Sequence, residues 1–380
     1  MRIAIYWSLI ISILGMPACR KKDLTIDEAL VYSEQWLWRQ QSADGGWHSE
    51  THAVLRDGRV LTPYILYHLV AGKDNLYHET EQVKKAVGFI TKEMRSALSE
   101  DSTSLTDYPN YSAAYALKVL QRLDEDTSLQ HIIAKYLLDQ QFLEHRGFTP
   151  DSLVYGGWGY GEPDLSNGKY GHVDISHTRR ITEALIAGDY LDEKRKNAVR
   201  LFLSGVQRSQ DDDRRYEGCE SRDSIPYDGG FVSSIVTLAT NKSQPVEIAG
   251  GGIHYPSYAT ATCDGFLCME ALGMQPSQSY GDAKKWLLEH QDLTTIDGLS
   301  KADPEQWADI MHYYHFAVRA EAMSIIEPYG NWKKQLINIL VKEQQPDGYF
   351  INPIGGVNKE DDPLMATIFC VQAMKRLGEG

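Results

Sequence analysis

Hydrophobic and polar positions divide the chain into two alternating kinds of segment, each long enough for a helix. In the first kind, apolar residues recur at three- and four-residue spacing between charged ones, as they do from Leu336 to Val341. This period predicts an amphipathic helix with one buried face. The segments with this pattern are Glu28–Gln41, Glu81–Leu98, Ser128–Phe142, Asp192–Ser209, Tyr280–Gln291 and Asn331–Gln345.

The second kind of segment is poor in charge and apolar nearly all round, which predicts a helix buried on more than one side. These segments follow the amphipathic ones in regular alternation: Leu61–Val70, Tyr108–Leu123, Asp174–Leu191, Tyr255–Met274, Asp309–Ile326 and Pro363–Leu377. Short connections favour antiparallel neighbours. The pattern predicts an all-α fold, a single α/α toroid over residues 26–380 in which six outer helices surround a closed barrel of six inner ones. The alternative that the same pattern allows is an open solenoid.

A turn of repeated sequence joins the polar helices to the buried ones. It reads Gln-Gln-Ser-Ala-Asp-Gly-Gly-Trp at residues 40–47 and Gln-Gln-Pro-Asp-Gly-Tyr-Phe at 344–350, with weaker copies at 156–160 and 228–231. Asp-Gly supplies the positive φ angle of a tight turn, and the aromatic residue after it can pack on the preceding helix. We therefore predict that each copy has a structural role, in which the turn and its aromatic residue pack on the helix just before it, and we call such a turn a staple.

The Gln–Asp-Gly-Trp turn followed by a buried helix resembles the repeat of the squalene/hopene cyclases. More widely, it resembles the prenyltransferase and squalene-oxidase repeat of the terpenoid cyclase and protein prenyltransferase superfamily. The resemblance covers the chain from about Glu28 to Leu377. It implies a toroid whose cavity binds a hydrophobic isoprenoid ligand and, if the chain is an enzyme, transforms it as a cyclase or mutase does.

The candidate site follows from the expected barrel, because parallel inner helices bring their N-terminal ends and the preceding loops to one rim. Polar and aromatic groups that converge on a concave rim are typical of a ligand site. Our candidates for acid–base chemistry are Asp174, His177, Asp264 and Asp361. Our candidates for ligand binding are Trp47, His48, Tyr108, Trp158, Tyr160, His172, His254, Tyr258, His312 and His315.

The protonating acid of the cyclases has no counterpart in the sequence. Squalene/hopene cyclases carry Asp-x-Asp-Asp followed by Thr, and the nearest match is Asp174-Ile175-Ser176-His177-Thr178. Ser176 stands in the place of the acid, and a serine cannot protonate an alkene. We therefore interpret the protonation-type motif as not intact.

A zinc site like that of the protein prenyltransferases is the next comparison. Imidazole, thiolate and carboxylate groups suit zinc, and the candidate ligands are Cys263, Asp264, Cys268, His254, His312 and His315. The Asp-x-Cys arrangement of that family is not reproduced, because Cys263 directly precedes Asp264. We expect no metal and no cofactor.

Two further functions stay open at this point. A carbohydrate-active toroid, lyase or hydrolase, needs paired carboxylates across an aromatic cleft that holds a glycan, and Asp107, Asp174, Asp264 and Asp361 could supply them. A non-catalytic scaffold for a ligand or a protein is the other alternative. A deep apolar pocket favours isoprenoids, an open acidic and aromatic cleft favours glycans, and a filled centre favours a scaffold.

The first residues predict export and a lipid anchor. A short basic start is followed by an apolar run, Ile3–Leu14, which is too short to span a bilayer comfortably. A small residue then precedes Cys19, an arrangement that resembles the bacterial lipobox. We expect a signal peptide at 1–18, a tether at 19–25 lipidated on Cys19, and a lipid-anchored place in the bacterial cell envelope. The alternatives are an ordinary signal peptide cleaved after Ala18 and an uncleaved anchor.

Charge and cysteines narrow the possible partners. The formal net charge is −14, and without a basic stripe an acidic chain is a poor partner for nucleic acid. The cysteines after Cys19 are Cys219, Cys263, Cys268 and Cys370, and they form no Cys-x-x-Cys pair. We expect buried free thiols.

Overall fold

The computed structural model describes residues 24–71, 80–99, 108–161, 169–214, 226–236, 240–247, 253–326 and 331–378. The predicted signal peptide, the lipidation site Cys19, and the candidates Asp107 and Cys219 lie outside these residues. Within the described parts of the chain, no helix combines the length and the apolar character needed to cross a membrane.

Two sets of helices alternate along the described chain. The outer helices are α2 (Ile26–Arg39), α4 (Glu81–Ala97), α6 (Thr127–Asp139), α8 (Glu193–Gln207), α10 (Gln278–Glu289) and α13 (Trp332–Glu343). The inner helices are α3 (Leu61–Leu69), α5 (Pro109–Leu123), α7 (Ile175–Ala187), α9 (Ala259–Ala271), α12 (His312–Ile326) and α14 (Pro363–Gly378). The short elements are α11 (Trp307–Ile310), the 3-10 turns Ala53–Leu55 and Glu144–Arg146, and the antiparallel pair β1 (Val246–Glu247) and β2 (Ile253–His254).

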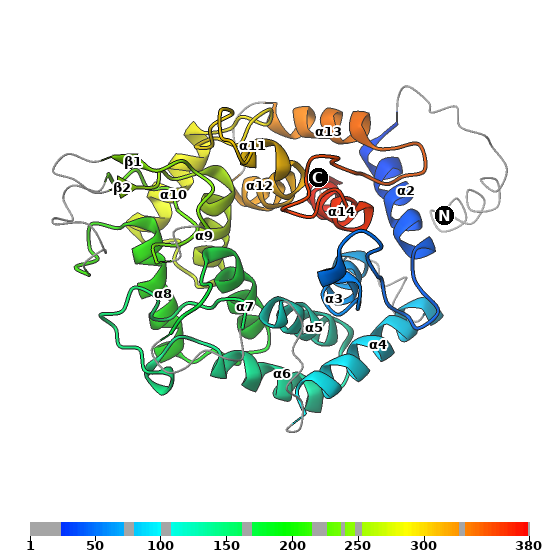
Figure 1. Cartoon of the computed structure of the whole chain (residues 1–380), viewed down its shortest axis with the longest axis horizontal. Coiled ribbons are helices and arrows are strands. Elements are labelled where there is room, and N and C mark those ends of the chain that lie inside the picture. The colour runs from blue at the N-terminus through cyan, green and yellow to red at the C-terminus, as the bar shows by residue number, and fades with distance from the viewer. Residues whose placement is uncertain are drawn as a thin grey trace.

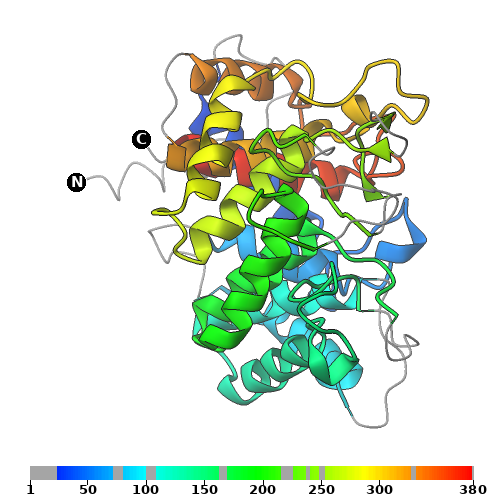
Figure 2. The same ribbon diagram turned by 90° about the vertical axis from the view of Figure 1, so that its left-hand side faces the viewer.

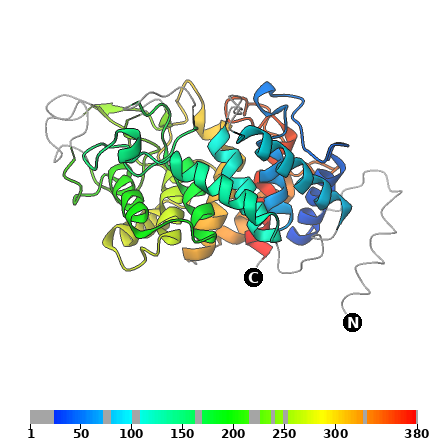
Figure 3. The same cartoon turned by 90° about the horizontal axis from the view of Figure 1, so that it is seen from below.

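The inner helices form a ring in which each contacts the next, and α14 also contacts α3, so that the last inner helix meets the first (Figure 1). The outer helices pack on the outside of this ring, with α4 and α6 against α5, α8 and α10 against α9, and α2 and α13 against α14. The predicted all-helical α/α toroid is confirmed. Figures 2 and 3 show that the C-terminal end of α14 lies on the opposite side of the toroid from the β1–β2 hairpin.

The repeated turns are structural staples, as predicted. In each of four copies a glutamine side chain donates to the carbonyl of the turn glycine. The pairs are Gln41 with Gly45, Gln141 with Gly156, Gln207 with Gly229, and Gln344 with Gly348. The same amide also donates to a backbone carbonyl of the next outer helix: those of Gln82, Arg195, Ser279 and Ala29. Since the fourth copy reaches α2, this staple links the last outer helix to the first.

The aromatic residue of each turn is tied to the following inner helix. Its backbone N–H donates to a threonine hydroxyl in the first turns of that helix. The pairs are Trp47 with Thr62, Trp158 with Thr178, Phe231 with Thr262, and Phe350 with Thr367. The turn glycines lie against the next outer helix: Gly156 has φ +89°, and a Cβ there would lie 1.8 Å from the carbonyl oxygen of Ala198. Glycine is therefore required at that position.

The buried carboxyl group of Glu360, which precedes α14 and contacts the first turn of α12, predicts that the free energy of unfolding depends on pH. Glu360 accepts the backbone N–H groups of Tyr313 and Tyr314, at 2.9 and 2.8 Å, and burial raises its pKa from 4.5 to about 7. Between those pH values the folded protein holds a proton that the unfolded chain has lost. The stability that this proton contributes is full below pH 4.5 and falls as the pH rises to about 7, by about 3 kcal/mol in all.

The check is urea denaturation from pH 4.5 to 8 of the wild type and of Glu360→Gln. We expect the wild type to lose about 3 kcal/mol relative to the variant across this interval, because only the wild type titrates at this position. Parallel stability curves for the two proteins would contradict the assignment.

Candidate functional site

A cavity of about 560 Å³ opens among the N-terminal ends of the inner helices, and we call it the rim cavity. Aromatic and aliphatic side chains make up much of its lining: Leu55, Val60, Tyr108, Tyr111, Tyr160, Ile175, Tyr258, Trp307, Met311, Tyr314, Met365 and Phe369. Its polar lining includes His172, Asp174, Ser176, His177, Lys242, Lys359 and Asp264. The volume lies within the range of about 300–1,000 Å³ that is usual for small-molecule sites.

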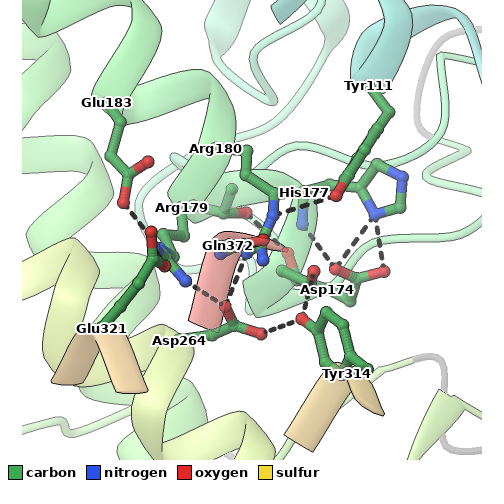
Figure 4. A network of polar contacts seen from close by, with 12 residues as sticks. Tyr111, Asp174, His177, Arg179, Arg180, Glu183, Asp264, Tyr314, Glu321 and Gln372 are labelled. Carbon is green, nitrogen blue, oxygen red and sulfur yellow. Dashed lines mark hydrogen bonds and ion pairs between the residues drawn. The ribbon is translucent and has the colours of Figure 1, made fainter. Parts of the chain in front are cut away.

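The Asp264 carboxylate joins the rim cavity to a buried network of charges (Figure 4). Its Oδ1 accepts from Arg180 at 2.6 Å and from Arg179 at 2.9 Å, and its Oδ2 accepts from the hydroxyl of Tyr314 at 2.6 Å. Both guanidinium groups are almost completely buried. Burial acts to lower the pKa of Arg180, but the Asp264 carboxylate together with the nearby Tyr314 and Tyr111 holds this pKa well above its usual value.

Arg179 extends the network toward the other end of the toroid. It pairs with Glu321 and, at 2.6 Å, with Glu183, which in turn pairs with Lys118 at 2.5 Å. The buried network thus holds the three carboxylates of Asp264, Glu183 and Glu321 and the three cations of Lys118, Arg179 and Arg180. Its charges balance, which is the condition under which buried charges are tolerated.

A second cavity, of about 960 Å³, lies at the C-terminal ends of the inner helices, and we call it the charged cavity. Lys118, Arg179, Glu183 and Glu321 line it, so the buried network borders both cavities. Its other lining residues include Tyr67, His68, Tyr115, Arg122, Glu270, Lys333 and Arg376.

A His–Asp–His cluster occupies one wall of the rim cavity. Asp174 is the N-cap of α7 and accepts the backbone N–H of His177 through Oδ1 at 2.8 Å. Its Oδ2 lies 2.5 Å from Nε2 of His172 and 2.9 Å from Nδ1 of His177. Burial acts to raise the pKa of Asp174, but the charges and hydrogen bonds of the two histidines hold it well below its usual value. The carboxyl group is therefore ionised.

The partly buried amine of Lys242 lies on another wall of the rim cavity. The Nζ of Lys242 is 4.0 Å from the ring centroid of Trp307, an arrangement in which the ring face attracts the cation. Burial lowers the pKa of Lys242, and the charge of Asp174 acts in the opposite direction. Lys359, also in the lining, lies over the ring of Tyr108 at 5.1 Å.

The structure brings part of the predicted site together. The predicted site residues that line the rim cavity are Tyr108, Tyr160, His172, Asp174, His177, Tyr258 and Asp264. The sequence did not single out Tyr111, Arg180, Lys242, Trp307 or Tyr314. The adjacent Arg179 and Arg180, with Glu183 one turn later in a helix predicted to be buried, were the signal that could have pointed to a buried network.

Two predicted ligand-binding residues, Trp47 and Trp158, lie in the core instead. Both are fully buried. Their indole N–H groups donate to the carbonyls of Leu37 and Leu137, each at 2.7 Å. These rings anchor the repeated turns to the preceding outer helices and belong to the lining of neither cavity.

The remaining candidates lie outside the lining of the rim cavity. His48 contacts Asp44, and His312 contacts Glu343 of the outer helix α13. Asp361 pairs with His52. His254 lies in the β1–β2 hairpin, and His315 is buried beside Phe316. Position at the start of an inner helix was therefore not enough to place these side chains in one pocket.

The zinc ligands suggested by the sequence do not form one group. Cys263, Cys268 and Cys370 are buried free thiols, as predicted. Among the described residues, one group has the composition and spacing to hold a metal ion: His172, Asp174 and His177.

Comparison with known proteins identifies the fold. No protein-family model matches the chain, and no curated protein matches it. A variant of the type II terpene cyclase MstE from Scytonema, in complex with its substrate geranylgeranyl dihydroxybenzoate, matches with a TM-score of 0.57 and 11% identity, over 93% of this chain and 97% of its own. The chain has the fold of the type II terpene cyclases.

Other structures share the terpene-cyclase toroid. A protein from Actinoplanes matches with a TM-score of 0.56 and 12% identity, over 93% of this chain and 99% of its own. The Lin0763 protein from Listeria innocua matches with a TM-score of 0.54 and 11% identity, over 94% and 97%. Identities this low establish the fold alone, and function has to be inferred from the site.

Proposed function

We propose that this chain is an envelope lipoprotein whose toroid binds an isoprenoid ligand in the rim cavity. The observation that carries the proposal is the cavity itself, which has the volume of a small-molecule site and a wall of apolar and aromatic side chains that includes Trp307, Met311 and Phe369. The substrate complex of MstE supports the same class of ligand, since its substrate carries a geranylgeranyl chain.

Two walls of different character favour an amphipathic ligand. Met311, Met365 and Phe369 offer apolar surface to a ligand. Each Å² of apolar surface that the ligand removes from water stabilises the complex by about 25 cal/mol. Asp174 and its histidines offer hydrogen-bonding groups to a polar head. We propose that the isoprenoid tail lies on the apolar wall and that the head lies near this cluster.

The chemistry of the cavity favours binding over protonation-initiated cyclisation. Its carboxyl groups within the described chain are those of Asp174 and Asp264, and both are paired with cations or imidazoles. Ser176, which stands in the place of the cyclase acid, lies with its hydroxyl 3.0 Å from that of Tyr314. None of these groups is suited to protonate an alkene.

Titration with geranylgeranyl dihydroxybenzoate by isothermal calorimetry tests the proposal. We expect saturable binding that Trp307→Ala weakens roughly 10- to 100-fold, because removing a large aromatic contact costs about 1.5–3 kcal/mol. The matched control is Tyr67→Ala in the charged cavity, which should leave the affinity unchanged. Equal loss in both variants, or no binding by the folded wild type, would refute binding in the rim cavity.

The lipid anchor is a separate part of the proposal and rests on the lipobox-like sequence before Cys19. Labelling the full chain in bacteria with radioactive palmitate tests it. Incorporation that Cys19→Ser abolishes and Cys370→Ser preserves is the expected result. Equal labelling of both variants would remove the lipoprotein part and leave the ligand proposal untouched.

A carbohydrate-binding function is favoured by one observation, the charged cavity. Tyr67 and Tyr115 line it together with Glu183 and Glu270, a combination of rings and carboxylates that suits a glycan. In a glycan array, binding that Tyr67→Ala abolishes and Trp307→Ala preserves would favour this second candidate.

A further inference from the structure

The His–Asp–His cluster brings three possible metal ligands together at one wall of the rim cavity. His172, Asp174 and His177 each offer one atom suited to bind a metal, and the three atoms lie within 4.8 Å of one another. They come from a stretch of six residues at the start of α7, so one short segment positions all three. The other ring nitrogen of His177, Nε2, is buried and has no hydrogen-bond partner within the described structure.

We infer that this cluster is a site for a divalent transition metal, with Zn²⁺ as the ion that fits best. Two imidazoles and one carboxylate are a ligand set that zinc binds, at about 2.0–2.2 Å from each ligand atom. Three protein ligands leave a fourth position for a water or a ligand oxygen, as in catalytic zinc sites. Because all three residues line the rim cavity, that position opens toward it.

The surroundings hold the three ligands in place. The backbone N–H of His177 fixes Oδ1 of Asp174, which leaves Oδ2 beside the two imidazoles. The ring of Tyr160 stacks on that of His172 with 3.6 Å between centroids and 13° between planes. Such outer contacts orient metal ligands and tune their affinity.

Other histidines of the described chain make a useful contrast. His52 pairs with Asp361 at 2.6 Å, and His312 pairs with Glu343 at 2.9 Å. Each is a single histidine with a single carboxylate, and neither belongs to a group of three possible ligands. These pairs are matched controls, since they share the residue types of the cluster without its convergence.

The test uses the full chain, stripped of metal with a chelator, and Zn²⁺ alone as the probe. We expect about one Zn²⁺ per chain in competition with a chromophoric chelator, and Co²⁺ should give the visible absorption of a tetrahedral site. Asp174→Asn and His172→Ala should each weaken binding at least about 100-fold, more than the loss of an outer contact does. Asn preserves an N-cap oxygen for α7, so this variant should still fold.

His52→Ala and His312→Ala should bind Zn²⁺ like the wild type. The inference is overturned if the folded wild type takes up no stoichiometric Zn²⁺. It is also overturned if Asp174→Asn and His172→Ala, shown to be folded by circular dichroism, bind as tightly as the wild type. Because the metal is titrated without any organic ligand, this result is independent of the isoprenoid proposal.

Discussion

Asp264→Asn should destabilise the fold by about 3–5 kcal/mol, because it leaves the buried guanidinium groups of Arg179 and Arg180 without one of their carboxylates. All three side chains are almost fully buried, so solvent cannot replace the lost charge. Guanidinium chloride denaturation followed by circular dichroism measures the effect. The control is Asp139→Asn, which removes the partner of the exposed Lys135 and should leave the midpoint unchanged.

A double variant separates charge balance from simple loss of packing. Arg180→Met with Asp264→Leu removes one charge of each sign and leaves Arg179 with Glu183 and Glu321. We expect it to recover most of the stability that Asp264→Asn loses, since replacing both partners of a buried pair by apolar groups is often tolerated. A double variant no more stable than the single one would contradict the balanced network.

Trp158→Ala should destabilise the fold by about 3–5 kcal/mol, the usual cost of deleting a fully buried large aromatic ring. Trp158→Phe keeps most of the ring and loses the hydrogen bond to the carbonyl of Leu137, so we expect a smaller loss, of about 1 kcal/mol. Chemical denaturation gives both values.

The same variant distinguishes a staple from a ligand contact. Trp158→Phe should bind geranylgeranyl dihydroxybenzoate with the affinity of the wild type. Trp307→Ala, which removes a residue of the rim-cavity lining, should bind it more weakly. A Trp158→Phe protein that is stable but has lost ligand affinity would restore this residue to the binding site.

The helical architecture was predictable because each helix shows its own local pattern of apolar and polar residues. The alternation of amphipathic and apolar segments placed every inner and outer helix of the described chain near its observed bounds. The segment from Asp309 to Ile326 is an exception in detail, since it is divided into α11 and α12 near Met311. The threonines that anchor the staples were not anticipated, because a threonine within an apolar segment looks like any other small buried residue.

The candidate site was predictable only in part, because its polar contacts join distant segments. Arg179 reaches Asp264 across 85 residues and Glu321 across 142, and no local pattern encodes such pairs. The cluster around Asp174 is local, so its residues were found together, but a helix-start rule also selected His312, which faces an outer helix instead. Side-chain direction decides between these outcomes, and periodicity does not specify it at helix ends.

Native mass spectrometry combined with lipid extraction, on the full chain purified in mild detergent, tests the central claim most directly. We predict that an isoprenoid co-purifies with the wild type and with Tyr67→Ala, and that it is lost from Trp307→Ala. A folded wild type that carries no isoprenoid and binds glycans on an array instead would contradict the account.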